Sequence, residues 1–305
     1  MASRPELSPI ALFAYMRPDH LRLTVQSLQA NAEATHSDLH VFCDAPKRAE
    51  HADAVQAVRR FADSITGFAS VTVVKREANL GLARSIIDGV TRLTAQHGRV
   101  IVVEDDLLLS PHFLRYMNDG LACYADDAQV ASLHGYCYPV VEPLPETFLL
   151  RGADCWGWAT WARAWTHFNP DGAALLVQLG ERRLARAFDL DGSYPFTRML
   201  RHQVQGRNDS WAVRWHASCF LDGLLTVYPG RSLVHNIGND DSGTHCDARD
   251  DYRQLVAEAP VSVQRLPLTE SAVGRDAFIR FFRQSRPSML ALLGRVARRW
   301  LKDLR

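Results

Sequence analysis

The chain of 305 residues lacks a long apolar run, a signal-peptide pattern and an excess of one charge. No window reaches the length and apolarity of a transmembrane helix, so no membrane span is predicted. The first residues, Met-Ala-Ser-Arg-Pro-Glu-Leu-Ser-Pro, contain no apolar core of the kind that directs secretion. The formal net charge of +1 gives no general attraction for nucleic acid, and no nucleic-acid partner is expected.

Paired cysteine spacings are missing as well. Six cysteines are scattered along the chain with no Cys-x-x-Cys motif, which argues against a structural zinc site. Unpaired thiols are typical of a reducing compartment, so we expect a cytoplasmic protein. With 47% hydrophobic and 23% charged residues the composition is that of an ordinary globular protein, in one large domain or two intimate ones.

The first hundred residues alternate apolar runs with stretches of helical periodicity. Strands are predicted at residues 10–15, 39–43, 71–75 and 100–103, and helices at about 17–32, 51–62 and 79–93. Strands separated by helices imply parallel pairing, hence an α/β fold with a doubly wound sheet. Ligands of such sheets bind beyond the carboxyl ends of the strands. Polar residues gather at those ends, at 15–17, 44, 76–79 and 104–106.

The last of these ends carries the most informative motif. Four apolar residues, 100–103, run directly into Glu104, Asp105 and Asp106. Adjacent carboxylates repel one another and resist burial, and a divalent cation relieves both effects. Hard oxygen ligands suit Mg²⁺ or Mn²⁺, either of which can hold a diphosphate. The alternative is an ordinary acidic turn at the end of a strand.

Tryptophan is concentrated in one segment. Residues 151–165 contain Trp156, Trp158, Trp161 and Trp165, with Gly157 between the first two. These rings could simply fill a core. They could also form a platform for the apolar faces of sugar rings, with the glycine allowing a close approach of backbone and ligand.

Four ordered motifs resemble those of a known enzyme family. They are Ala14-Tyr-Met-Arg-Pro-Asp-His20, Asn79-Leu-Gly-Leu-Ala-Arg84, Glu104-Asp-Asp106 and Cys155-Trp-Gly-Trp-Ala-Thr-Trp161. Together they resemble family 2-type glycosyltransferases, in particular bacterial relatives of the N-acetylglucosaminyltransferase I group, over residues 8–250. The resemblance implies a GT-A (Rossmann-like) fold with a mixed, mainly parallel sheet flanked by helices. It also implies a nucleotide-sugar donor and a cation, Mn²⁺ or Mg²⁺, bound at a variant of the Asp-x-Asp motif.

The same resemblance suggests roles for individual residues. Asp106 would bind the metal, while Glu104 and Asp105 would face the ribose and the donor sugar. Arg17 matches a position that contacts the nucleotide, and Asp44 matches an acid that accepts a hydrogen bond from the uracil imide. Taken by themselves, a helix-starting arginine and a helix-capping aspartate explain the last two equally well.

Further contacts to the nucleotide-sugar are expected from Tyr15, Asn79 and Arg84, although a turn asparagine and a solvated arginine are simple alternatives. Trp156 and Trp158 would shape the pocket for donor and acceptor. Residues 8–110 would thus form the nucleotide-sugar-binding half of one domain, 111–255 its acceptor and catalytic half, and 256–305 a C-terminal extension.

A catalytic base is predicted at Asp209. The segment Gly206-Arg-Asn-Asp-Ser-Trp211 resembles the acid-plus-tryptophan segment of the family. A base there would take the proton of the acceptor hydroxyl, and direct displacement would invert the anomeric centre. The alternative is that Asp209 caps the helix that follows, although Asn208 and Ser210 could cap it instead.

Two segments near the C-terminus complete the prediction. The Gly-, Asn- and Asp-rich loop 237–245 could close over phosphates, with His245 as a metal or diphosphate ligand, whereas His235 would be structural. Asp240 and Asp241 form a second possible metal pair, with a solvated turn as the simpler alternative. Residues 288–305 form a basic amphipathic pattern that would lie on an anionic membrane surface or pack on its own domain. The enzyme would then be peripheral at the inner face of the cytoplasmic membrane.

The expected activity is therefore inverting, metal-dependent glycosyl transfer. The donor would be a UDP-sugar, with UDP-N-acetylglucosamine as the leading candidate, and the acceptor a hydroxyl of a surface glycan or lipid-linked saccharide. A sugar-nucleotide nucleotidyltransferase is one alternative, although residues 15–19 lack the Gly-rich first loop expected of it. A non-catalytic carbohydrate-binding protein of the same fold is the other.

Overall fold

A single sheet of eight strands runs through the protein in the computed structural model, which describes residues 7–238 and 252–285. The strand order is β3-β2-β1-β4-β8-β6-β9-β7. Its strands are β1 (Ile10–Ala14), β2 (Asp38–Cys43), β3 (Ser70–Lys75), β4 (Arg99–Glu104), β6 (Val130–His134), β7 (Thr147–Arg151), β8 (Trp158–Trp161) and β9 (Leu225–Pro229). A second sheet pairs β5 (Leu107–Leu109) with β10 (Val234–Asn236).

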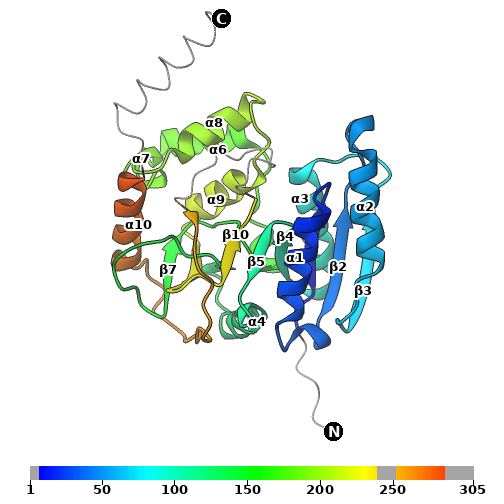
Figure 1. Ribbon diagram of the computed structural model, residues 1–305. Helices are drawn as coiled ribbons and strands as arrows, with labels where there is room; N and C mark the ends of the chain where they lie inside the picture. The colour runs from blue at the N-terminus through cyan, green and yellow to red at the C-terminus, as the bar shows by residue number, and fades with distance from the viewer. Residues whose placement is uncertain (1–6, 239–251, 286–305) are drawn as a thin grey trace, which may run out of the picture.

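The first four strands form the parallel half of the large sheet. β1 pairs with both β2 and β4, and β2 pairs with β3, all in parallel. The connecting helices are α1 (Pro18–Gln29), α2 (Ala52–Asp63) and α3 (Leu82–His97). Helix α2 packs on β2 and β3, α1 lies between α2 and β5, and α3 packs on β1 and β4 (Figure 1). The doubly wound sheet predicted for this half is confirmed.

Local sequence accounts for these elements. Pro18 at the first helical position begins α1, whose buried residues Leu21, Val25 and Leu28 recur at helical spacing. Gly98 ends α3 in a left-handed conformation with φ of 73°. β1 and the middle of β4 are buried on both faces, as expected for central parallel strands.

The second half of the sheet is mixed. β8 lies antiparallel between β4 and β6, β6 pairs in parallel with β9, and β7 pairs antiparallel with β9 at the edge. The helices of this half are α4 (Phe113–Cys123), α5 (Ala162–Trp165), α6 (Gly172–Glu181), α7 (Ala185–Phe188), α8 (Phe196–Val204), α9 (Trp211–Leu221) and α10 (Ala272–Gln284). The predicted fold class, a mixed and mainly parallel sheet flanked by helices, is confirmed.

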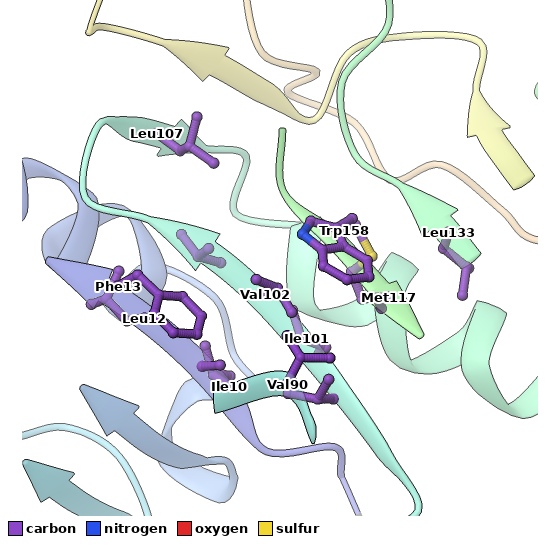
Figure 2. Packing of buried hydrophobic residues seen from close by; sticks show 14 of the residues in the cluster. Ile10, Leu12, Phe13, Val90, Ile101, Val102, Leu107, Met117, Leu133 and Trp158 are labelled. Carbon is purple, nitrogen blue, oxygen red and sulfur yellow. The ribbon is translucent and has the colours of Figure 1, made fainter. Parts of the chain in front are cut away.

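The main core joins both halves. Figure 2 shows Leu12 of β1 beside Val102 of β4, with Trp158 of β8 and Met117 of α4 beyond them. All four side chains are fully buried. Because one hydrophobic cluster spans the parallel and the mixed parts of the sheet, the strand ends of both halves are held in a fixed arrangement.

The C-terminal region departs from expectation in one respect. Helix α10 packs against β7 (Figure 1), where Phe278, Phe281 and Phe282 complete an aromatic cluster. In this region the sequence pattern predicts a helix only at 288–305, and that segment lies outside the described residues. Within 7–238 and 252–285, no helix is long and apolar enough to cross a membrane.

Candidate active site

The acidic triplet lies at the carboxyl end of β4, where the sequence pattern placed it. Asp105 is buried, and Glu104 and Asp106 are partly buried. Burial and the neighbouring carboxylates raise the pKa of Glu104 to about 8 and that of Asp105 to about 6, while Arg17 opposes both shifts. The site therefore holds negative charge at an energetic cost that a nearby cation reduces.

Among the described residues, Arg17 supplies this positive charge. It immediately precedes α1, and its Nη2 donates to Asp106 Oδ2 at 2.8 Å and lies 3.4 Å from Asp105 Oδ1. Asp105 is further occupied by the backbone N–H of Tyr15, at 3.2 Å from Oδ2. Through these contacts Asp105 connects the loop after β1 to the end of β4. Asp106 is the more exposed of the two carboxylates.

The segment after β10 closes onto the same carboxylate. The Ile237 N–H donates to the backbone carbonyl of Asp106 at 2.8 Å. A Cβ placed on Gly238 would collide with the Asp106 carboxylate and would lie 2.9 Å from Arg17 Nη1. A larger residue there would have to displace these two side chains, so the Gly-rich loop predicted to close over phosphates begins against the acidic triplet. Its continuation, with Asp240, Asp241 and His245, lies outside the described residues.

Asp44 organises a neighbouring loop. Its Oδ1 accepts from Ala45 N and Leu80 N, and its Oδ2 from Gly81 N, each at 2.9 Å. Asn79 Nδ2 returns a hydrogen bond to the Ala45 carbonyl at 2.6 Å. A carboxylate has about four acceptor positions, so one on Oδ2 remains for a ligand. Asp44 thus connects the loop after β2 to the turn before α3.

Tyr15 and Arg84 flank these loops. The Tyr15 hydroxyl accepts from Lys47 N at 2.9 Å and lies 2.6 Å from His51 Nδ1, so it holds the loops after β1 and β2 together. Arg84 is exposed in the first turn of α3 and makes no hydrogen bond or ion pair with the described residues.

The tryptophan-rich segment divides between core and surface. Trp158, Trp161 and Trp165 are buried, and the ring of Trp158 stacks on Trp211 of α9 at 5.2 Å. Trp156 is only partly buried. Its backbone N–H donates to His134 Nε2 at 3.0 Å. Core packing therefore accounts for three of the four rings, and Trp156 alone has a surface that a ligand could meet.

At Gly157 the backbone lies close to other protein side chains, Val234 and Phe113. Gly157 has φ of 63°, and a Cβ there would fall 2.8 Å from Val234 and 3.1 Å from Phe113. Its carbonyl accepts from Gly135 N at 2.6 Å. This glycine allows the backbone after Trp156 to pack on the strands, which is a structural reason for its presence rather than contact with a ligand.

Asp209 does not cap α9. Ser210 takes that position, accepting from Val213 N at 3.2 Å. The Asp209 side chain is 64% exposed and its Oδ1 pairs with Arg214 Nη2 at 3.0 Å. Trp211 follows directly, so the Trp158–Trp211 stack connects Asp209 to the strand beside β4. The capping alternative is therefore wrong, and the contact of Asp209 with α9 is its ion pair with Arg214.

One acid near this site had no signal in the sequence. Asp154, between β7 and β8, accepts from the Tyr138 hydroxyl at 3.1 Å and lies 3.8 Å from His134 Nδ1. Burial, Asp154, Glu104 and Asp106 all raise the pKa of the Cys155 thiol, which places this segment close to the acidic triplet. No motif marks an isolated acid; only the packing of strand ends reveals it.

The described residues contain no group of three or more His, Cys, Asp or Glu side chains that could hold a metal by themselves. The five described cysteines are free thiols, as the scattered spacing predicted. A cation at Asp106 would therefore need further ligands from a diphosphate, from water or from residues outside the described ranges.

Comparison with known proteins gives distant likenesses only. The chain matches no protein-family model and no curated protein. A mannosyltransferase from Pyrobaculum calidifontis, PcManGT in complex with GDP-Man and Mn²⁺, is similar with a TM-score of 0.39 and 11% identity over 73% of this chain and 70% of that one. S. aureus TarS is similar with a TM-score of 0.31 and 14% identity. The match covers 46% of this chain and only 23% of TarS. Likenesses this low assign neither activity nor substrate to the chain.

Proposed function

We propose that this protein is a glycosyltransferase that transfers a sugar from a nucleotide-sugar to a saccharide hydroxyl. In its finer form the proposal is of an inverting, metal-dependent enzyme whose donor is a UDP-sugar, with UDP-N-acetylglucosamine as the first candidate. The acceptor would be a surface glycan or a lipid-linked saccharide. The parallel half of the sheet would bind the nucleotide and the mixed half the acceptor.

One observation carries the proposal: Arg17 and Asp106 meet at the carboxyl end of β4, beside the start of the Gly238 loop. Ligands of open α/β sheets bind at such strand ends. An arginine suits a diphosphate because its planar fork of donors matches phosphate oxygens. A carboxylate beside it suits a divalent cation that bridges protein and diphosphate. An arginine suited to the phosphate oxygens and a carboxylate suited to the cation are thus joined by one hydrogen bond.

The residues present fit a hard divalent cation with shared ligands. Asp106 offers carboxylate oxygens and is the more exposed of Asp105 and Asp106. Burial raises the pKa of its neighbours Glu104 and Asp105, so their anions are disfavoured without a nearby positive charge. When bound, Mn²⁺ or Mg²⁺ would neutralise the departing diphosphate. Arg17 would supply a second positive charge to the same oxygens.

The proposed base is Asp209. Its carboxylate would take the proton of the acceptor hydroxyl while the hydroxyl oxygen attacks the anomeric carbon and the bond to the diphosphate breaks. Arg214 would orient the carboxylate, since their side chains pair at 3.0 Å. Attack opposite the leaving group inverts the anomeric configuration.

The nucleotide side of the pocket would be formed by loops held together by Asp44 and Tyr15. The remaining acceptor position on Asp44 Oδ2 would receive the imide N–H of uracil. Asn79 and Arg84 lie at the adjoining turn and first helical turn, where they could reach the base or the phosphates. Trp156 would contact the donor sugar.

Product analysis with a panel of nucleotide-sugars tests this function. The protein is incubated with Mn²⁺, each of UDP-GlcNAc, UDP-glucose, UDP-galactose and GDP-mannose, and simple saccharide acceptors. A glycosyltransferase releases the nucleoside diphosphate and forms a new glycoside. In a parallel reaction with added pyrophosphate, a nucleotidyltransferase instead converts the nucleotide-sugar and pyrophosphate to the nucleoside triphosphate and the sugar 1-phosphate, and a carbohydrate-binding protein leaves the donor intact in both reactions. Either of the last two results contradicts the proposal.

A further inference from the structure

Three side chains form a chain of hydrogen bonds beside the parallel half of the sheet. Tyr15 follows β1 directly, and Arg48 and His51 lie just before α2. The Tyr15 hydroxyl oxygen is 2.6 Å from His51 Nδ1. Arg48 contacts the other ring nitrogen, His51 Nε2, through Nη2 at 2.9 Å and through Nε at 3.2 Å. The Arg48 guanidinium also pairs with Glu50 at 3.1 Å.

The arginine decides the direction of each hydrogen bond in this chain. A guanidinium has donors only, so His51 Nε2 must accept and cannot carry a proton. A neutral imidazole that accepts at Nε2 carries its proton on Nδ1. The contact with Tyr15 is therefore a hydrogen bond from His51 Nδ1–H to the Tyr15 oxygen. The opposite tautomer would place an Nε2–H against two N–H groups of Arg48.

The Tyr15 oxygen thus receives two hydrogen bonds. The second comes from the backbone N–H of Lys47 at 2.9 Å. A phenol oxygen accepts about two hydrogen bonds and donates one. With its acceptor positions filled by His51 and Lys47, the hydroxyl proton points elsewhere, and no hydrogen bond from it reaches a described residue. Tyr15 is only partly buried and Lys47 is exposed, so an acceptor from outside can approach.

This hydroxyl lies between the two loops of the proposed nucleotide site. The Tyr15 backbone N–H donates to Asp105 Oδ2 at 3.2 Å, and Arg17 stands in the same loop. Lys47 belongs to the loop after β2, which Asp44 connects to the turn before α3. A nucleotide held by Arg17 and Asp44 would offer acceptor oxygens on its phosphates, ribose and base to a donor placed between them.

We propose that His51, held by Arg48, is a positioning residue that directs the Tyr15 hydroxyl proton toward an acceptor oxygen of the bound nucleotide. This inference rests on the proposed function for the identity of the ligand. His51 itself does not touch the nucleotide. It fills an acceptor position of Tyr15, so that the hydroxyl cannot turn its proton inward. A donor that is oriented before binding loses less freedom when the ligand arrives.

Two variants of nearly equal size at His51 test the direction of this hydrogen bond. The amide nitrogen of His51→Asn can replace Nδ1–H as a donor to Tyr15, whereas the carboxylate of His51→Asp can only accept and would take the hydroxyl proton. Isothermal titration calorimetry with UDP and Mn²⁺ measures the effect. We expect Kd to stay within about two-fold of wild type in His51→Asn and to rise roughly five- to ten-fold in His51→Asp and in Tyr15→Phe.

The Tyr15→Phe background separates this effect from charge repulsion by the new aspartate. Without the hydroxyl, His51→Asp should raise Kd by less than about two-fold more, because residues that act through one another are not additive. A full additional loss in the double variant overturns the inference, as does a loss in His51→Asn equal to that in His51→Asp. His97→Asp, at the far end of α3, is the matched control and should bind as the wild type does.

The NMR shifts of the imidazole nitrogens give a readout that a merely structural histidine would not share. In the free wild-type protein we expect a proton on His51 Nδ1 and none on Nε2. Arg48→Ala removes the group that selects this tautomer, so the preference should weaken and the Kd of UDP should rise. A proton on His51 Nε2 in the wild type overturns the inference.

Transfer kinetics on the same variants distinguish this inference from the proposed function. Because Tyr15 acts in binding, His51→Asp should raise the donor KM and leave kcat unchanged. Nucleotide binding that follows the expected pattern without any transfer contradicts the proposed function and supports the inference. Transfer with a wild-type donor KM in both His51→Asp and Tyr15→Phe does the reverse. Absence of UDP binding by the wild type overturns the inference.

Smaller ligands locate the acceptor oxygen. If Tyr15→Phe weakens the binding of uridine, the oxygen belongs to the base or ribose. If it weakens the binding of inorganic diphosphate with Mn²⁺, the oxygen belongs to a phosphate. Either result supports the proposed role of His51, and equal affinity of Tyr15→Phe and wild type for uridine, diphosphate and UDP contradicts it.

Discussion

The guanidinium of Arg17 and the carboxylate of Asp106 form an ion pair of 2.8 Å that joins the loop after β1 to the end of β4. Both side chains are largely buried, and Asp105 shares the same guanidinium at 3.4 Å. A cation entering this site therefore meets an oxygen that already has a positive partner. Under the proposed function, a diphosphate that arrives with the metal would draw Arg17 away from Asp106, and the binding of the two would be coupled.

Replacing Arg17 should weaken nucleotide binding. Arg17→Ala removes a positive charge from the diphosphate site, and we expect the Kd of UDP with Mn²⁺ to rise roughly ten-fold or more, by about 1.4 kcal/mol. Isothermal titration calorimetry measures this. Arg22→Ala is the matched control, because Arg22 lies in the helix that Arg17 precedes and pairs with Asp19 in an exposed ion pair. Equal affinity in Arg17→Ala and Arg22→Ala would remove Arg17 from the nucleotide site.

Replacing Asp209 should slow transfer without weakening donor binding. Asp209→Asn cannot take a proton, so kcat should fall by roughly 10²–10⁴ while the thermal stabilisation by UDP and Mn²⁺ stays unchanged. Asp222→Asn, at the opposite end of α9, should retain activity. Transfer at the wild-type rate by Asp209→Asn would mean that another group, or none, acts as the base.

Asp44 should contribute strongly to stability. Asp44→Ala leaves the N–H groups of Leu80 and Gly81 without their acceptor, and a lost acceptor for buried donors destabilises by roughly 1–3 kcal/mol. Urea unfolding of the variant measures the loss. Asp53→Ala, an exposed acid in the first turn of α2, is the control and should change stability by less than about 1 kcal/mol. A similar loss in both variants would contradict the role assigned to Asp44.

Acid should destabilise the protein partly through His216. Burial lowers the pKa of His216 to about 4 from an ordinary value of 6.5. Below pH 6.5 the unfolded state binds a proton that the native state does not, so stability is lost as pH falls from 6.5 toward 4, by about 3 kcal/mol in all. Above pH 6.5 this contribution is constant.

The comparison of wild type with His216→Gln isolates this effect, because glutamine can still accept from Ala153 N and does not titrate. Urea unfolding at several pH values should show the two stability curves converging as pH falls below 6.5. Parallel curves over that range would show that His216 titrates normally in the native state.

The parallel half of the sheet was predictable because apolar runs end in polar residues there. β1 to β4 and the helices between them lie within a few residues of their predicted positions, since the strands are apolar runs separated by helical segments. Glu104 to Asp106 and Arg17 were found for the same reason, and they meet as parallel strand ends must.

The mixed half was harder, because long-range packing decides it. Trp158 and Trp156 differ by two positions, yet one is fully buried and the other reaches the surface. Antiparallel pairing of β8 between β4 and β6 sets that difference, and no local pattern encodes it. No local pattern marks Asp154, because its neighbours His134 and Tyr138 are brought to it only by folding.

Thermal unfolding of wild type and Asp106→Asn, each with UDP, with Mn²⁺ and with both, tests the central claim most directly. A ligand that binds only the native state raises its apparent stability. UDP should stabilise the wild type only together with Mn²⁺, and Asp106→Asn should lose that stabilisation, while Asp119→Asn, an exposed acid of α4, should keep it. Stabilisation of Asp106→Asn equal to that of the wild type, or none in the wild type with any nucleotide, would contradict a metal-assisted diphosphate site at Asp106.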